Sequence, residues 1–364
     1  MKFKLKEKEI INGILIYSYL TVSLISKILQ LFLGINREII YVLFLFILVL
    51  NIIYNSEKKL KDVVFFYIIV GIIFISGILN NIKYISYDNI ALMLINVLPA
   101  YFIFRINIKE KILYKIYKQV IIINILGYFP LAMFTQNYMD FSYNIAINGS
   151  LALCMYMYKK NIFMLCAYFL SIFCLITNGS RGTILCIAFY SIYVVISNLY
   201  LKSKKLLGIF ILIFITIISN YEFIIRNLYN IFPNSRVVFS LFQGVFIKSE
   251  GRIILYEYCK ELIVKNKLGY GPLATRSLIS WQPYPHSLIL ELLIDYGVFL
   301  GGVIFIGVLY IGKKLILKQS FICQLGKCYW IIGFIMLLIS GSFYYNPYLF
   351  IAFAFFIRSK NQST

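Results

Sequence analysis

The sequence contains few charged residues and only one histidine. Charged residues make up 13% of its 364 residues, whereas soluble domains carry about 25%. This composition argues against a soluble globular domain and excludes a disordered chain, a collagen and a disulfide-rich secreted scaffold. The seven cysteines and the histidine show no metal-ligand spacing, so neither a metal centre nor a cofactor is expected.

Long apolar runs are abundant instead. Hydrophobic residues account for 61% of the chain, and the mean hydropathy is +0.85. The runs are long and mostly uncharged, whereas an outer-membrane barrel would show short alternating segments. We therefore predict an all-α polytopic membrane protein with about 12 transmembrane helices. The predicted spans are residues 10–33, 39–54, 63–80, 89–106, 117–134, 144–158, 161–177, 183–200, 206–220, 287–311, 326–341 and 345–357.

The distribution of Lys and Arg predicts the orientation. A net charge of +21 would suggest nucleic acid in a soluble protein, but here cytoplasmic loops explain it, and no nucleic-acid partner is expected. If the N-terminus lies inside, the short outer loops contain only Arg37, Lys83 and Arg181. We therefore predict cytoplasmic N- and C-termini. The first apolar run is too long for a signal peptide and is expected to be a retained helix.

Residues 221–286 form the only long connection between predicted spans, and the alternation places them outside the membrane. We therefore divide the chain into an N-terminal membrane bundle of about nine helices (1–220), a large extracytoplasmic loop (221–286) and C-terminal membrane helices (287–364). The loop carries eight Lys or Arg and four Glu, and it is rich in Tyr, Phe, Leu and Ile. It is expected to fold as a small cap rather than to be disordered.

Helical spacing within the loop predicts a helix over residues 250–264, capped by Ser249. The helix is expected to lie on the membrane surface or to pack under the cap. Arg252 lies on the same stripe as Leu255 and Cys259, where its guanidinium either snorkels to the interface or binds an anion. The segment Gly269-Tyr270-Gly271-Pro272 predicts a turn that could bring the backbone close to a ligand, although such clusters are most often turns alone.

His286 stands where the loop returns to the membrane. Glu291 and Asp295 follow it, one turn apart on one face of an apolar helix. Intramembrane acids are costly and are functional candidates, but for Asp295 pairing with a buried Lys or Arg is the preferred interpretation. A histidine that makes only structural hydrogen bonds is the competing interpretation for His286. Gly297, Gly301 and Gly302 are expected to allow close helix packing.

Arg181 lies in a tight outer turn, residues 178–183, that precedes a helix. Ser180 or Thr183 is expected to cap this helix, and backbone N–H groups beside an arginine make an anion site. An interfacial anchor is the equally good alternative for Arg181.

Four segments in order resemble the bacterial O-antigen ligase and polymerase superfamily. They fall in a motif region, residues 178–302, and the N-terminal half of the chain carries no motif. In the last segment, Ser287 stands where the family has Asn or Ser, and Asp295 stands where the family has Glu. The segments are Asn-Gly-Ser-Arg-Gly (178–182), Glu-Gly-Arg-x3-Tyr (250–256), Leu-Gly-Tyr-Gly-Pro (268–272) and Pro-His-Ser-x3-Glu-x3-Asp-Tyr-Gly (285–297).

The resemblance implies a metal-independent inverting glycosyltransferase of the GT-C type at the outer face of the plasma membrane. Its donor and acceptor would be glycans on undecaprenyl diphosphate in the lipid bilayer, and a chain-length regulator protein is a further candidate partner. By the same resemblance, Arg252 and Arg181 hold the donor diphosphate and His286 acts near the acceptor hydroxyl. Arginines can offset the charge of a diphosphate leaving group without a metal, and a neutral imidazole can take a proton.

Three further residues are candidates for a supporting role, and two other functions compete with polymerisation. Glu291 matches a family acid, and Tyr270 and Arg276 of the loop are further supporting candidates. We favour a polymerase that joins repeat units into O-antigen or capsular polysaccharide. One alternative is a ligase that transfers glycan to a terminal acceptor. A lipid-linked oligosaccharide flippase is the alternative from another class, but it would need ionisable residues scattered through a cavity, and no internal repeat is visible.

Overall fold

The structure is a computed structural model that describes seven stretches of the chain and a few single positions. Within these residues the regular structure is helical and no strand occurs, so the predicted all-α class is confirmed. The described residues are 2–34, 99–106, 108–134, 138–202, 219–244, 250–279 and 284–361, with the positions 97, 208, 212, 215, 216 and 281.

Five of the described helices are long and apolar enough to cross a bilayer. They are, in whole or in part, α1 (Lys2–Leu33), α5 (Glu110–Phe134), α8 (Arg181–Lys202), α14 (Leu288–Ile316) and α15 (Phe321–Ile339). A shorter apolar helix, α7, covers Ile162–Asn178. Large apolar side chains point outward from these helices; Phe299 of α14, for example, is 84% exposed. A lipid environment accommodates such faces, and the chain is a multi-pass membrane protein.

Two of the weaker predicted spans coincide with helices, and four others lie wholly or partly outside the described residues. The weak spans 144–158 and 345–357 coincide with helices, α6 (Tyr138–Lys159) and α16 (Pro347–Asn361). The spans 39–54 and 63–80 lie outside the described residues, as do half of 89–106 and most of 206–220. The number of twelve spans and the GT-C architecture therefore stay predictions.

The chain divides into two compact units. One unit combines Met1–Ile116 with Glu250–Thr364, and the other is Tyr117–Ser249. The long loop is therefore shared, because residues 221–249 belong to one unit and residues 250–286 to the other. The three-part division at residues 220 and 286 stays a prediction about the membrane boundaries.

The unit Tyr117–Ser249 is a helical bundle in which α6 packs against α7 and α8. A side chain at Gly149 of α6 would place its Cβ 2.6 Å from the Cβ of Ser171, so the absence of a side chain permits this close packing. Asn124 donates from Nδ2 to Oδ1 of Asn148 at 3.2 Å, which satisfies polar groups inside the bundle.

Two short helices from the first half of the loop pack against each other, and the second of them also packs against α7. They are α10 (Tyr221–Ile231) and α11 (Arg236–Phe242). Ser235 is the N-cap of α11, and its hydroxyl also donates to the backbone oxygen of Ile176 in α7. The ring of Phe232 lies 6.0 Å from that of Phe173. This half of the loop is folded, as its composition predicts.

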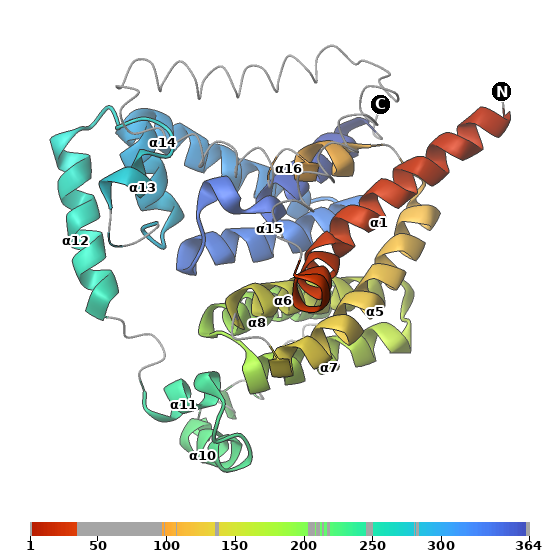
Figure 1. Cartoon of the computed structure of the whole chain (residues 1–364), viewed down its shortest axis with the longest axis horizontal. Coiled ribbons are helices and arrows are strands. Elements are labelled where there is room, and N and C mark those ends of the chain that lie inside the picture. The colour runs from red at the N-terminus through yellow and green to blue at the C-terminus, as the bar shows by residue number, and fades with distance from the viewer. Residues whose placement is uncertain are drawn as a thin grey trace. The chain divides into compact units, whose positions relative to one another are not determined.

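The other unit has an aromatic core where the helical stretch 99–106 meets α1, α15 and α16 (Figure 1). Phe104 is fully buried, and its ring centroid lies 5.6 Å from Tyr19, 6.1 Å from Tyr329 and 5.6 Å from Phe355. Such ring pairs stabilise a core beyond the area that they bury. This core fixes the helices whose ends carry the candidate site.

The helix α14 is broken at Gly297, where φ is +75° and ψ is 175°. Two helical pieces, residues 288–296 and 298–316, therefore meet at a kink. The pieces pack so closely that a Cβ at Gly301 would lie 2.4 Å from the backbone oxygen of Leu292. The expected close packing is confirmed at Gly297 and Gly301 but not at Gly302, where a Cβ would meet nothing within 4 Å, and the backbone break itself was not expected.

Candidate active site

The helix predicted for the loop is α12 (Glu250–Lys265), whose bounds agree with the expected range 250–264 to within one residue. Its apolar stripe is buried in one cluster with Ile279 and with Ile294 of α14. The stripe residues Leu255, Cys259 and Leu262 have exposed fractions of 6% or less. Of the two expected placements, packing within the cap is therefore observed.

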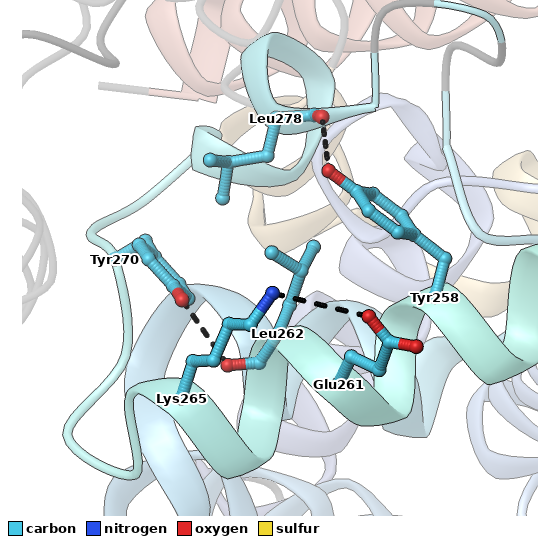
Figure 2. A network of polar contacts seen from close by, with 6 residues as sticks. All are labelled: Tyr258, Glu261, Leu262, Lys265, Tyr270 and Leu278. Carbon is cyan, nitrogen blue, oxygen red and sulfur yellow. Dashed lines mark hydrogen bonds and ion pairs between the residues drawn. The ribbon is translucent and has the colours of Figure 1, made fainter.

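Two tyrosines hold α12 to the segment that follows it (Figure 2). The hydroxyl of Tyr258 donates to the backbone oxygen of Leu278 at 3.3 Å, and the hydroxyl of Tyr270 donates to that of Leu262 at 3.2 Å. The first bond reaches forward from α12, and the second returns to it. Tyr270 thus has a structural contact in the region where the sequence suggested a supporting role.

Arg252 lies in the first turn of α12 and is half-buried, on the same stripe as Leu255 and Cys259. Its predicted cap, Ser249, lies outside the described residues. Burial raises the pKa of the Cys259 thiol to about 12, so Cys259 is a packed neutral residue. The seven cysteines are free, and all except Cys166 are buried.

The Gly269–Gly271 turn lies directly against the break in α14. The backbone N–H of Tyr270 donates to the oxygen of Ile294, that of Gly271 to the oxygen of Asp295, and that of Val298 to the oxygen of Lys267, each at 2.9 Å.

The two backbones approach so closely that neither has room for a side chain. A Cβ at Gly269 would lie 2.4 Å from the nitrogen of Gly297, and a Cβ at Gly297 would lie 2.4 Å from the carbonyl carbon of Leu268. Both glycines also have positive φ, which side chains disfavour. The turn therefore approaches a protein helix rather than a ligand, and two of the four motif segments contact each other here.

Asp295 is fully buried and fastens the next short helix, α13 (Ala274–Leu278). Its Oδ2 accepts from the backbone N–H of Leu273 at 3.2 Å, and its Oδ1 accepts from that of Thr275 at 2.8 Å and from the Thr275 hydroxyl. The preferred interpretation of an ion pair with Lys or Arg is wrong, because backbone and hydroxyl donors occupy the carboxylate.

Glu291 is buried one turn earlier and fastens a different segment, the connection between α15 and α16. Its Oε1 accepts from the hydroxyl of Ser342, and its Oε2 accepts from the backbone N–H of Phe343 at 2.7 Å. The short 3₁₀ helix η2 (Phe343–Tyr345) begins at this point. The two acids thus hold two segments that are distant in sequence.

The segment Ser340–Tyr345 contacts three candidate regions and was missed by the sequence reasoning. Ser340, the C-cap of α15, accepts from the hydroxyl of Tyr284 at 3.1 Å. Tyr345 accepts from Nη1 of Arg276 at 3.0 Å, and its ring centroid lies 4.4 Å from the guanidinium carbon. The segment carries no motif and few charges, so only its contacts reveal it.

His286 lies two residues before α14 in a left-handed backbone conformation with a φ of 53°. Its ring contacts the ring of Tyr284 edge-on at 4.5 Å, and its backbone oxygen accepts from the hydroxyl of Tyr256 in α12 at 3.5 Å. Its Nδ1 is buried and has no hydrogen-bond partner among the described residues. A residue held in a strained conformation with an unused ring nitrogen is typical of a functional site.

The electrostatic environment links the ring pair of His286 and Tyr284 to two arginines. Burial, and then the charge of Arg252, lowers the pKa of His286 to about 4. Burial raises the pKa of Tyr284, and the charges of Arg276 and Arg252 both oppose this rise. Arg252 therefore acts on both rings, and Arg276 acts on that of Tyr284. The imidazole is neutral near pH 7 and can accept a proton.

Arg181 opens α8 in the other compact unit and is exposed. The expected cap is present and reciprocal: the N–H of Thr183 donates to the hydroxyl of Ser180 at 3.4 Å, and the N–H of Ser180 donates to the hydroxyl of Thr183 at 3.3 Å. A Cβ at Gly179 would lie 2.2 Å from the backbone oxygen of Leu175, which explains the glycine in this turn. The grouping of Arg181 with Arg252 and His286 stays a prediction.

The region around His286 thus offers a neutral base, two guanidiniums and a frame of buried acids. Among the described residues, no three His, Cys, Asp or Glu side chains could hold a metal ion together. Arginines beside a proton acceptor suit a reaction in which a hydroxyl attacks and an anionic group leaves.

Comparison with known proteins finds a family match over the motif region. Residues 166–306 match the model of the O-antigen ligase family, and the match includes all four motif segments. No curated protein and no solved structure matches the chain. The match implies a glycosyl-transfer enzyme of the ligase or polymerase type. The match over residues 166–306 thus supports membership in the O-antigen ligase/polymerase superfamily.

Proposed function

We propose that the protein is a polymerase that joins oligosaccharide repeat units carried on undecaprenyl diphosphate into O-antigen or capsular polysaccharide. The observation that carries this proposal is His286, whose Nδ1 has no hydrogen-bond partner in the part of the chain that the structure describes. The residue also lies within the electrostatic reach of Arg252, at the start of an apolar helix. The matched family supplies the class of reaction.

The proposed reaction is an inverting glycosyl transfer. A hydroxyl of the acceptor glycan attacks the anomeric carbon of the donor, a new C–O bond forms, and the bond from that carbon to the diphosphate oxygen breaks. The imidazole of His286 takes the proton of the attacking hydroxyl, and undecaprenyl diphosphate leaves with the bonding electron pair. General bases of this kind contribute about 10²–10⁴-fold to the rate.

Arg252 offsets the negative charge of the leaving diphosphate in this proposal, together with Arg181. Guanidinium groups form bidentate hydrogen bonds with phosphate oxygens and keep their charge at the membrane boundary. Arg252 also lowers the pKa of His286, and a bound diphosphate would oppose that effect. Substrate binding is therefore expected to raise the pKa of the imidazole before it accepts the proton of the attacking hydroxyl.

The proposal places this chemistry at the outer face of the plasma membrane, with both termini in the cytoplasm and the loop 221–286 outside. The donor lipid would reach the site from the bilayer, and a chain-length regulator is a candidate partner. We favour a polymerase over a ligase because polymerases predominate in the family and nothing in the chain points to a lipid A core. The matched family is described as O-antigen ligase, which keeps terminal transfer as the second candidate.

Reconstitution tests the proposal. The full chain in proteoliposomes is supplied with a purified lipid-linked repeat unit, and the products are separated by size without added metal or nucleotide. A ladder of lipid-linked oligomers is expected. Transfer only to an added lipid A core acceptor would identify a ligase, and the absence of any transfer to either acceptor would contradict glycosyl transfer by this chain.

A further inference from the structure

We infer that Arg276 binds the diphosphate of the lipid-linked donor together with Arg252, and that Asp295 is the residue that positions Arg276 for this contact. The inference rests on the proposed function and assigns substrate contact to a residue outside the four motif segments. It is carried by a chain of contacts from α14 through α13 to η2.

The first link is the start of α13, which depends on Asp295. The helix has only five residues, and its N-cap, Leu273, has a left-handed backbone with a φ of 66° and makes no side-chain cap. A helix this short is not stable alone. The carboxylate of Asp295 provides the missing cap from another helix, because it accepts from Leu273 and Thr275.

The second link runs from Thr275 to the neighbouring Arg276. Since Asp295 binds both the backbone N–H and the hydroxyl of Thr275, it fixes the backbone position from which Arg276 extends. The guanidinium of Arg276 lies over the ring of Tyr345 and donates to its hydroxyl. Stacking and one hydrogen bond together hold a half-exposed guanidinium in one orientation.

The third link is the support of Tyr345 by the other acid. Glu291 accepts from Ser342 and Phe343, the residues that begin η2, and η2 ends at Tyr345. Both partners of the Arg276–Tyr345 pair are therefore positioned by carboxylates one turn apart on α14. A guanidinium oriented before the substrate arrives loses little entropy on binding.

The ligand follows from the charges that surround Tyr284 and His286. Arg252 and Arg276 belong to different elements, α12 and α13, and both act electrostatically on Tyr284. A glycosyl diphosphate on a lipid carries two phosphates, each with one negative charge, and each phosphate can accept two hydrogen bonds from one guanidinium. Arg252 acts on His286, and Arg276 contacts Tyr345 in the segment whose Ser340 binds Tyr284, so each guanidinium can take up part of this charge.

Inhibition by undecaprenyl diphosphate tests the diphosphate contact directly, because this product contains the diphosphate and no sugar. In proteoliposomes that carry the full chain, Arg276→Ala should raise its inhibition constant roughly 10-fold or more, as expected for the loss of hydrogen bonds to a charged group. Ser277→Ala, on the next residue of α13, is the matched control and should leave the constant unchanged. An unchanged constant for Arg276→Ala would overturn the inference, and weaker binding only of donors with acidic sugars would redirect it to the glycan.

A double-mutant cycle tests the positioning role. Asp295→Asn places an amide N–H where the N–H groups of Leu273 and Thr275 already point, so the start of α13 loses an acceptor. This change should release α13 and raise the inhibition constant about as much as Arg276→Ala. In the Arg276→Ala background it should cause no further increase, because both changes remove the same contact. Effects that multiply would show that Asp295 acts independently of Arg276.

Two further sets of variants distinguish the possible results of these experiments. Thr275→Val removes only the hydroxyl bond to Asp295 and should give a smaller effect that also disappears in the Arg276→Ala background, so the cycle can be completed if Asp295→Asn does not fold. His286→Ala and Arg252→Ala serve as references in the same assay. If these two retain activity, the proposed function fails; if they lose activity while Arg276→Ala keeps a normal inhibition constant, only the inference fails.

Discussion

Two helix starts in this protein are capped in opposite ways. The start of α8 is capped locally by Ser180 and Thr183, which are three residues apart. The start of α13 is capped by Asp295, which lies 20 residues or more along the chain from its partners. The first arrangement can be predicted from a short motif, whereas the second exists only when the chain has folded. The comparison predicts that the remotely supported region is the more sensitive one.

The largest expected effect is on catalysis in the remotely supported region. His286→Ala and Arg252→Ala should each abolish chain lengthening, with losses of about 10²–10⁴-fold for the base, while the protein still inserts. Single repeat units on lipid should accumulate in cells that carry either variant. Glycan of normal length in either variant would argue against these roles.

A glycine at the break in α14 should be nearly as sensitive, through folding. Gly297→Ala places a Cβ 2.4 Å from the carbonyl carbon of Leu268 and forces a side chain into a backbone with a φ of +75°. The strain of this backbone conformation alone costs about 1–3 kcal/mol for a residue with a side chain, and the overlap adds to it. The yield of folded protein in detergent should fall sharply. Gly302→Ala, which meets nothing within 4 Å, is the matched control and should behave like wild type.

A substitution of Arg181 tests whether the locally capped start of α8 takes part in catalysis. Arg181→Lys keeps the charge but removes the bidentate fork, so roughly a 10-fold loss of polymerisation is expected if Arg181 holds a phosphate. The rate of polymerisation at saturating and at low donor concentrations measures this. Wild-type rates at both concentrations would reduce Arg181 to an interfacial anchor.

The cap itself should have a modest effect. Ser180→Ala removes one half of the reciprocal cap and should lower the free energy of unfolding by about 0.5–2 kcal/mol. Thermal unfolding in detergent compares this loss with that of Asp295→Asn, which should be larger because several buried donors lose their acceptor. Equal losses would remove the distinction between the two helix starts.

The smallest expected effect is that of mild acid on activity. An ordinary imidazole with a pKa near 6.5 is about 90% protonated at pH 5.5. Burial and Arg252 lower the pKa of His286 to about 4, so its neutral form persists at that pH. The ratio kcat/KM, which reports the free enzyme, should therefore change less than about twofold between pH 7.5 and 5.5. A tenfold loss over this interval would indicate a base with an ordinary pKa.

The helical class, the bounds of α12 and the cap of α8 could be predicted from the sequence. Each depends on residues within a few positions of one another, such as Leu255 and Cys259 on one stripe, or Ser180 and Thr183 in one turn. Hydropathy also located the apolar helices. These signals are local because helical periodicity and capping are local.

The contacts of the acids could not be predicted in the same way. Asp295 and Glu291 have the spacing of paired helix residues, but their partners, such as Thr275 and Ser342, come from other elements. The segment Ser340–Tyr345 has no charged residue and no motif, so its contact with Arg276 emerges only from packing. The break at Gly297 was hidden because a glycine in an apolar helix usually indicates close packing.

The break in α14 has a consequence for how the protein sits in membranes of different thickness. Glu291 and Asp295 lie before Gly297, and the turn at Gly269 contacts the break itself, so the first two turns of this helix are tied to α12, α13 and η2. The longer piece, residues 298–316, packs instead against α15, where Nε1 of Trp330 donates to the oxygen of Val308, so we predict that a change in hydrocarbon depth is taken up at the break and not among His286, Arg252 and Arg276. Activity should then depend little on the acyl-chain length of the host lipids.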